Sequence, residues 1–210
     1  MLAWTIVWPE TPVHAEARCL VRGRPRGAGV TFKRSVDVST PDVWVAVAMQ
    51  GLEDAASSGA DLVFLDLEDA CAPVAKVGAR ATAVAALAGQ DWGRTVRAVR
   101  VNGLDTPWCH GDVIEVVTGA RDALDVIIVP KARTARDVWW FDVLLTQLEA
   151  TLGLRRRIGL EVLIEESEGL ANAVEIARAS DRLEAIIFGA GDLSASQRAR
   201  VDGNFDPVSE

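Results

Sequence analysis

Two apolar stretches that each end in an acidic residue decide the fold: Ile158-Gly-Leu-Glu-Val-Leu-Ile-Glu165 and Leu183-Glu-Ala-Ile-Ile-Phe-Gly-Ala-Gly-Asp192. Both have the short, nearly continuous apolar run that is typical of a strand buried on both faces of a parallel sheet. In an α/β barrel, side chains at the carboxyl ends of the strands lie on the catalytic face. Two carboxylates on successive strands can share one hard cation through oxygen ligands. We therefore expect Glu165 and Asp192 to bind Mg²⁺, or Mn²⁺ in its place, at the mouth of a barrel.

The rest of the chain repeats this strand signature and places helical patterns between the strands. Further apolar runs cover residues 61–67, 95–101 and 124–130, and residues 36–38 form a plausible sixth strand. Apolar residues at three- and four-residue spacing, or alanine-rich runs, predict helices over 40–57, 74–87, 108–119, 135–152 and 167–179. Strands alternating with helices are typical of βα units in a parallel sheet. The predicted class is α/β, an incomplete TIM barrel of about six βα units.

The composition of the chain argues against a nucleic-acid-binding or membrane-spanning protein. The chain has 210 residues, half of them hydrophobic, and a net charge of −8, which argues against nucleic acid as the main partner. No apolar run approaches the roughly 18–20 residues needed to cross a bilayer, so we expect no membrane partner. The three cysteines are sparse, odd in number and in no metal-binding pattern, which favours a cytoplasmic location.

Residues 1–33 differ from the rest of the chain because they combine several arginines with prolines and glycines and show no sustained period. We expect them to form a poorly ordered basic extension, and residues 34–210 to form the partial barrel. An extension outside the core, or a misassigned start, explains the segment better than a targeting presequence. The apolar run is short for a secretory signal, and acids interrupt it.

Charged and polar residues cluster at the predicted strand ends. They are Asp66, Glu68 and Asp69 after one strand, Arg100 and Asn102 after the next, and Lys131 after the third. No glycine-rich dinucleotide fingerprint follows any strand. The sequence Gly-Ala-Gly at 189–191 precedes an acid rather than a phosphate-binding helix, so a nucleotide site is poorly supported.

Five motifs in a fixed order carry a specific resemblance. They are Asp66-Leu-Glu-Asp-Ala-Cys-Ala-Pro73, Arg100-Val-Asn-Gly-Leu-Asp-Thr-Pro-Trp108, Val129-Pro-Lys131, Ile164-Glu165 and Phe188-Gly-Ala-Gly-Asp192. This set resembles the citrate lyase β-subunit-like group of the HpcH/HpaI aldolase superfamily. Within that group it is most similar to the malyl-CoA and β-methylmalyl-CoA lyases, over residues 52–207.

The resemblance implies a TIM-barrel lyase that cleaves or forms a carbon–carbon bond next to a CoA thioester. The substrate would be a 3-hydroxyacyl-CoA such as malyl-CoA, and the products a CoA thioester and a 2-oxo acid such as glyoxylate. Glu165 and Asp192 match the Mg²⁺ ligands of the family. Arg100 matches an arginine that contacts substrate and neutralises developing negative charge. Arg34, Gly191 and Asp192 match substrate-binding positions, and family members suggest a homo-oligomer.

Each residue also has a plainer interpretation. Glu165 and Asp192 would then be exposed strand-end acids, and Arg100 a structural partner of Glu68. Glu68 and Asp69 either support the reaction, by holding metal-bound water or orienting Arg100, or cap the start of a helix. Lys131 would be a solvated loop lysine. Glu166 is an alternative ligand, but strand alternation points it away from Glu165.

Two departures from the family pattern leave two functions open. The first strand has an acid within it and no glycine after Pro41, which weakens CoA contact by Arg34. A full barrel has eight strands and about 250 residues, so we expect the last two βα units to be absent. The carboxylate that acts in proton transfer would then be absent too, because in the family it comes from the C-terminal segment of a neighbouring subunit. The alternative to a lyase is therefore a truncated, catalytically weak homologue that binds metal and ligand or assembles with related chains.

Overall fold

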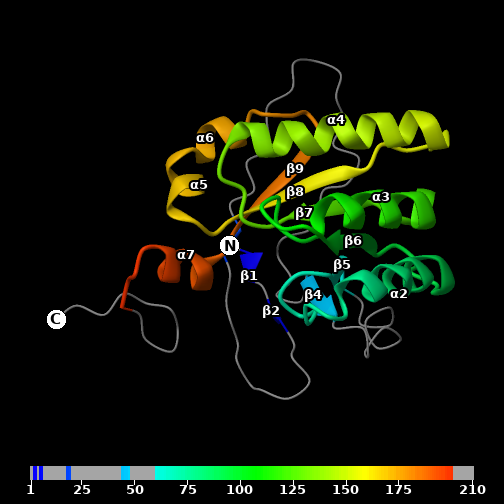
Figure 1. Cartoon of the computed structure of the whole chain (residues 1–210), viewed down its shortest axis with the longest axis horizontal. Helices are drawn as coiled ribbons and strands as arrows, with labels where there is room; N and C mark the ends of the chain where they lie inside the picture. Colours follow the sequence, from blue (N-terminus) through cyan, green and yellow to red (C-terminus); the bar gives the residue numbers. More distant parts are fainter. Residues whose placement is uncertain (1, 4, 7–17, 20–43, 48–59, 201–210) are drawn as a thin grey trace.

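A sheet of seven parallel strands forms the centre of the molecule (Figure 1). The computed structural model describes residues 2–3, 5–6, 18–19, 44–47 and 60–200. In sheet order the strands are β2 (Thr5–Ile6), β4 (Trp44–Val47), β5 (Leu62–Asp66), β6 (Val96–Arg100), β7 (Val126–Val129), β8 (Gly159–Ile164) and β9 (Leu183–Phe188). A separate antiparallel pair joins β1 (Leu2–Ala3) to β3 (Arg18–Cys19).

Strands β5 to β9 are neighbours in chain order, and every pairing among them is parallel. This confirms the predicted α/β fold and the five strands inferred from the apolar runs. The parallel arrangement brings all their carboxyl ends to one edge of the sheet, where Asp66 pairs in register with Arg100. The sheet is open, as in an incomplete barrel, since β9 pairs only with β8 among the described strands.

Helices connect the strands in the expected alternation. They are α2 (Lys76–Gly89), α3 (Cys109–Ala120), the 3₁₀ turn η1 (Arg121–Ala123), α4 (Ala135–Leu152), α5 (Ser167–Ala171), α6 (Ala173–Ile176) and α7 (Ala190–Ser196). Neighbouring helices α2, α3 and α4 follow successive strands (Figure 1). Helix α4 has the bounds predicted from sequence, because a capping box of Thr134 and Asp137 starts it and Gly153, at φ 63°, ends it.

Strands β5, β7 and β8 are buried along their whole length, as their continuous apolar runs predict, whereas β9 is mostly half-buried. Alternate residues such as Leu65, Val99 and Ile127 join the larger core, which includes the buried residues of α2, α3 and α4. Residues between them, such as Phe64 and Ile128, form a second cluster on the other face of the sheet. The second face is therefore mostly apolar, with the buried Glu161 of β8 opposite Ile128 as an exception.

Three details differ from the sequence-based expectation. The helix predicted over 40–57 is wrong at 44–47, which form β4, because Trp44-Val-Ala-Val47 pairs along its whole length with β5. The helix predicted over 167–179 is split into α5 and α6 at Asn172, whose side-chain amide donates a 2.9 Å hydrogen bond to the Arg133 carbonyl. Gly189 is followed directly by α7, so the segment 189–191 does lead into a helix, though one of only seven residues.

Some expectations fall on residues that the structure does not describe. The proposed strand at 36–38 and the domain boundary at residue 33 lie outside the described residues. Within 1–33 the structure describes three two-residue strands, and β2 joins the main sheet beside β4. No helix in the described part of the chain has the length and apolarity needed to cross a membrane.

Candidate active site

Acidic and basic side chains meet at the carboxyl edge of the sheet. Arg100 is the last residue of β6, and Asp66 is the last residue of β5. Lys131 lies two residues past β7, and Glu165 follows β8 directly. Asp192 lies in the first turn of α7, just after β9. Five successive βα connections thus contribute to one site, as the strand-end motifs predict.

Arg100 and Asp66 form a bidentate ion pair in the buried part of the site. The Arg100 Nε donates a 2.8 Å hydrogen bond to Asp66 Oδ1, and its Nη2 donates to Asp66 Oδ2. Both side chains are buried. Asp66 also accepts hydrogen bonds from the main-chain N–H groups of Glu68 and Ala70, so it fixes the start of the following loop. Asp66 is therefore the principal structural partner of Arg100, ahead of Glu68.

Glu68 lies between the two cations of the site. Its Oε1 accepts a hydrogen bond from Lys131 Nζ, and its Oε2 lies 3.2 Å from Arg100 Nη1. Burial raises the pKa of Glu68, against the opposing effect of Arg100 and Lys131. Asp69, by contrast, is exposed and reaches Arg100 only at 3.9 Å. Glu68 thus orients both cations, whereas Asp69 faces the mouth of the site.

Lys131 connects the acidic groups through both its main chain and its side chain. Its φ of 51° is unusual for a residue other than glycine. Its main-chain N–H donates a 2.8 Å hydrogen bond to Glu165 Oε1. Its ammonium binds Glu68 and lies 3.7 Å from Asp192 Oδ2. Lys131 is therefore part of the site, contrary to its interpretation as a solvated loop lysine.

Glu165 is a buried carboxyl group among other acids. Burial, together with the charges of Glu68 and Asp192, raises its pKa to about 7 despite the Lys131 hydrogen bond. A Cβ on residue 189 would lie 2.6 Å from the Glu165 Cβ, so the Gly189 position allows β9 to pass close to this carboxylate. Asp192, with 48% of its side chain exposed, completes the acidic group from the solvent side.

Lys76 and Asn102 fix the loop that carries Glu68 by donating hydrogen bonds to its main-chain carbonyls. Lys76 Nζ donates hydrogen bonds of 3.0 and 2.7 Å to the carbonyls of Leu67 and Glu68. The Asn102 side-chain amide donates to the same Leu67 carbonyl and to Asp112. Asn102 was a candidate from its position at a strand end. Lys76 was missed, because a lysine at a helix start gives no local sign of this role.

Glu166 is directed elsewhere, as strand alternation predicts. It accepts a hydrogen bond from Arg133 Nε, and its Oε1 lies 3.1 Å from Arg133 Nη2. Arg133 also reaches Asp105, so this group joins three loops at the rim of the site. Glu166 is therefore already paired with an arginine, which leaves Glu165 as the carboxylate that faces Lys131.

The carboxylates suit a magnesium ion better than a transition metal. In the described part of the chain, no group of three or more His, Cys, Asp or Glu side chains is arranged to hold a metal ion. Magnesium, however, is commonly bound by only one or two carboxylates, with water and substrate supplying the other oxygen ligands. Glu165 and Asp192 offer two such oxygen donors beside one lysine. Burial, followed by the charge of Glu68, raises the pKa of Glu165, and a divalent cation would favour its ionised form.

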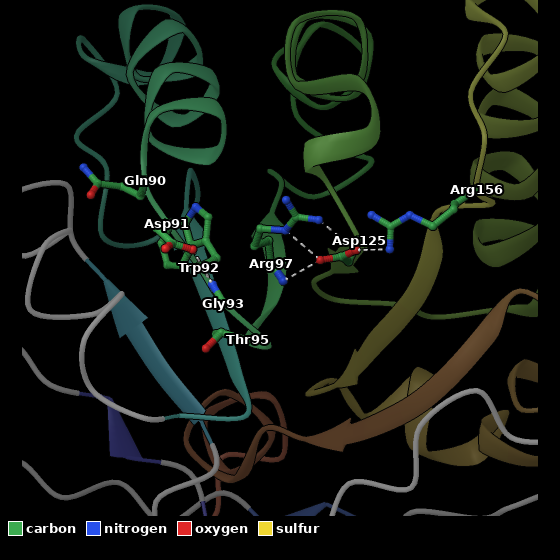
Figure 2. A pocket seen from close by; sticks show the side chains of 8 residues that line it. All are labelled: Gln90, Asp91, Trp92, Gly93, Thr95, Arg97, Asp125 and Arg156. Atoms are coloured by element: carbon green, nitrogen blue, oxygen red, sulfur yellow. Dashed lines mark hydrogen bonds and ion pairs between the residues drawn. The ribbon is translucent and has the colours of Figure 1, made fainter.

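A cavity of about 320 Å³ lies at the opposite, amino-terminal edge of the sheet (Figure 2). Asp125 lies there between two arginines: Arg97 Nε donates to it at 2.8 Å, and Arg156 Nη1 lies 2.8 Å away. Asp125, Arg97 and Arg156 are thus paired with one another rather than directed at a common point. The cavity is therefore separate from the predicted site, which lies at the other ends of the same strands.

The structure gathers most of the predicted site residues at one place. Glu68, Asp69, Arg100 and Lys131 are linked by ion pairs, and Glu165 and Asp192 both face Lys131. Gly191 lies beside Asp192 in the first turn of α7. Arg34 lies outside the described residues, so its predicted contact with substrate stays a prediction.

Comparison with proteins of known sequence agrees with the motifs. L-malyl-CoA/β-methylmalyl-CoA lyase of Cereibacter sphaeroides is 44% identical over 151 residues, which cover 72% of this chain and 48% of the relative. The citrate lyase subunit β of Leuconostoc mesenteroides subsp. cremoris is 37% identical over 150 residues, covering 70% of this chain and 48% of the relative. The chain thus spans about half the length of these curated relatives.

Comparison with solved structures agrees with the fold. Protein CitE of Mycobacterium tuberculosis, in complex with magnesium and acetoacetate, has a TM-score of 0.56 at 29% identity, with 75% of this chain and 57% of that chain covered. Haloferax volcanii malate synthase, as a lead(II) complex, has a TM-score of 0.67 at 18% identity, with 79% and 54% covered, and supports the fold alone. The sequence profile of the HpcH/HpaI aldolase/citrate lyase family matches residues 43–209. With the strand-end motifs assembled at one edge of a parallel sheet, the chain belongs to the HpcH/HpaI aldolase/citrate lyase family.

Proposed function

We propose that this chain is a Mg²⁺-dependent CoA ester lyase that cleaves or forms a 3-hydroxyacyl-CoA such as malyl-CoA. One observation carries the proposal: at the carboxyl edge of the sheet, Glu165 accepts a hydrogen bond from the Lys131 main-chain N–H and Asp192 lies near the Lys131 ammonium, with Arg100 reaching Glu68 beside them. Relatives that match about 70% of this chain are named as an L-malyl-CoA/β-methylmalyl-CoA lyase and as a citrate lyase subunit. Their chemistry is therefore the first activity to test.

Glu165 and Asp192 would hold the metal through their carboxylate oxygens, with Mn²⁺ as an acceptable substitute. When bound, the ion supplies Lewis acidity toward a carbonyl oxygen of the 2-oxo acid. The magnesium complexes of the Mycobacterium tuberculosis protein support this choice of metal. Glu165 must be deprotonated to bind the cation, and the Lys131 main-chain N–H fixes the orientation of its carboxylate.

Arg100 would stabilise negative charge that develops on the thioester. Its guanidinium is permanently charged and held rigidly by Asp66, so it costs little reorganisation during the reaction. Its Nη1 lies 3.2 Å from Glu68 Oε2. Glu68 would orient Arg100 and Lys131, and the exposed Asp69 would hold water at the mouth of the site.

The substrate side of the site is assigned by family resemblance. Arg34 and Gly191, with Asp192, would contact the CoA thioester and the 2-oxo acid. We also propose a homo-oligomer in the cytoplasm. Cys71 and Cys109, both free thiols, agree with a reducing compartment.

The direct test is glyoxylate release from malyl-CoA by the purified full chain with and without Mg²⁺. We expect metal-dependent turnover, and losses on the order of 100-fold or more in Glu165→Gln and Asp192→Asn. Glu166→Gln is the matched control, because Glu166 pairs with Arg133 at the rim. Mg²⁺ binding that depends on Glu165 but occurs without turnover would instead support a homologue that only binds metal and ligand. Turnover unaffected by Glu165→Gln would contradict the metal assignment.

A further inference from the structure

The Lys131 ammonium lies where acidic side chains from three different strand ends meet. It binds Glu68 Oε1 at 2.5 Å and lies 3.7 Å from Asp192 Oδ2. Glu165 is held by the main-chain N–H of the same residue. The Lys131 side chain is 28% exposed, so it can move without disturbing the buried core. A single positive charge therefore partly neutralises the cluster proposed to bind a divalent cation.

The two functions of Lys131 belong to different atoms. The main-chain N–H orients Glu165, and this hydrogen bond survives any change of side chain that keeps the backbone in place. The ammonium contacts Glu68 and Asp192, and these contacts depend on the side chain alone. A substitution at position 131 can thus remove the positive charge while leaving Glu165 oriented.

We propose that Lys131 is a built-in competitor of the divalent cation: its ammonium neutralises Asp192 and must leave this carboxylate when the metal binds. Lys131 then sets the metal affinity of the site and is a positioning residue rather than a metal ligand. The inference rests on the proposed metal site of Glu165 and Asp192. It goes beyond that site because it assigns the level of metal affinity to a residue that does not touch the ion.

Electrostatics gives the expected direction. Two cations that share one carboxylate repel each other, and the repulsion is strong where side chains are partly buried and screening is weak. Removing the ammonium should therefore tighten metal binding, by about 10-fold or more. A lysine that only supported the fold would give the opposite result, since its loss would loosen the site and weaken binding.

The test is calorimetric titration of the full chain with Mg²⁺, and separately with Mn²⁺, in metal-free buffer. We expect Lys131→Met to bind both ions more tightly than the unsubstituted protein, by about 10-fold or more. Lys131→Arg keeps the charge and should stay close to the unsubstituted affinity. Equal tightening by Lys131→Arg and Lys131→Met would show that charge is not the cause and would overturn the inference.

Arg133→Met is the matched control, because it removes the same charge from the same loop. In the part of the chain that the structure describes, Arg133 forms its ion pairs with Glu166 and Asp105 rather than with Glu68 or Asp192. Its loss should change Mg²⁺ affinity by no more than about twofold, since a more distant and more exposed charge is screened. Tightening as large as that of Lys131→Met would overturn the specific role of Lys131.

Lys131→Gln is a second variant, because it retains a donor for Glu68 without the charge. Tighter Mg²⁺ binding by either folded variant supports the inference, and unfolding of both would overturn it by showing a structural role. If the unsubstituted protein binds Mg²⁺ through Glu165 but Lys131→Met binds no more tightly, only the Lys131 inference fails. If neither the unsubstituted protein nor Lys131→Met binds Mg²⁺, the proposed metal site fails and the inference falls with it.

Discussion

Asp66 and Arg100 face each other in register on β5 and β6 and share two hydrogen bonds in a buried ion pair. The side chains are 3% and 8% exposed, so neither charge can be solvated when the other is removed. Asp66→Asn should therefore lower the free energy of unfolding by about 3–5 kcal/mol, the usual cost of breaking a buried pair. Urea denaturation monitored by tryptophan fluorescence measures this change.

Asp69→Asn is the control for Asp66. Asp69 is 54% exposed and lies 3.9 Å from the same guanidinium, so its loss should change stability by no more than about 1 kcal/mol. If the two variants were equally stable, the Asp66–Arg100 pair would not be the principal support of Arg100.

Glu165 should make the metal-free protein less stable at neutral and alkaline pH. Its pKa is raised from 4.5 to about 7, chiefly by burial, so ionisation is harder in the folded state than in the unfolded state. Above pH 7 the folded protein bears the full cost of this charge, and below about pH 4.5 it bears none. In EDTA, Glu165→Gln should therefore be about 1–3 kcal/mol more stable than the unsubstituted protein at pH 8. The advantage should shrink toward zero as the pH falls to 5.

Glu166→Gln separates this effect from a general loss of negative charge. Glu166 is paired with Arg133, so its amide variant should not gain stability at pH 8. The measurement is the urea midpoint of the unsubstituted protein, Glu165→Gln and Glu166→Gln at pH 5 and at pH 8. A pH-independent difference between Glu165→Gln and the unsubstituted protein would refute the electrostatic explanation.

Asp125, in the cavity at the amino-terminal edge of the sheet, should stabilise the fold less in acid than at neutral pH. Burial acts to raise the pKa of Asp125, but hydrogen bonds from Arg97 and the charge of Arg156 hold it below its usual value. Its stabilising contribution is therefore complete above about pH 4 and is lost as the pH falls further. Asp125→Asn should cost about 1–3 kcal/mol at pH 7 and progressively less as the pH falls below about 4, as measured by urea denaturation.

Asp122→Asn is the control for this prediction. Asp122 is paired with the exposed Arg155, and the pairing lowers its pKa too, yet solvent screens the interaction. No measurable change in the urea midpoint at pH 7 is expected. If Asp122→Asn lost as much stability as Asp125→Asn, burial of the ion pair would not explain the contribution of Asp125 to stability.

The sequence predicts those parts of the fold that local patterns determine. Strands β5 to β9 are marked by continuous apolar runs, and α4 by apolar residues at three- and four-residue spacing. The short β4 was misassigned as helix, because Trp44-Val-Ala-Val47 is apolar enough for either structure. Its pairing with β5, a contact distant in sequence, decides the outcome.

In the site, the residue types and strand ends were predictable, but their pairing was not. Glu68 was the alternative partner considered for Arg100 and does lie 3.2 Å from its Nη1, but the sheet register places Asp66, which was not expected as a partner, directly opposite. Lys131 resembled a solvated loop lysine. Its position among Glu68, Glu165 and Asp192 depends on a left-handed backbone conformation and on three strand ends meeting. Such pairings arise from tertiary structure and leave no mark on the local sequence.

The contacts of Arg182 likewise arise from tertiary structure and leave no mark on the local sequence. This arginine, 1% exposed, donates hydrogen bonds to Asp142 and Glu149 of α4 and to the Ile158 carbonyl before β8. It therefore joins α4 to the starts of β8 and β9. Arg182→Met would leave two carboxylates and a carbonyl without this donor.

Arg182→Met should lower the free energy of unfolding by about 3–5 kcal/mol at pH 7. Burial acts to raise the pKa of Asp142, and Ser180 and Arg182 hold it below its usual value, so removing Arg182 should raise it. The destabilisation should accordingly diminish in acid, where the carboxylate is protonated. Arg157→Met is the matched control, because Arg157 reaches the same Asp142 oxygen at 3.2 Å but is 53% exposed, and its loss should cost at most about 1 kcal/mol. Equal shifts of the urea midpoint in the two variants would show that burial of the Arg182 guanidinium does not determine its contribution.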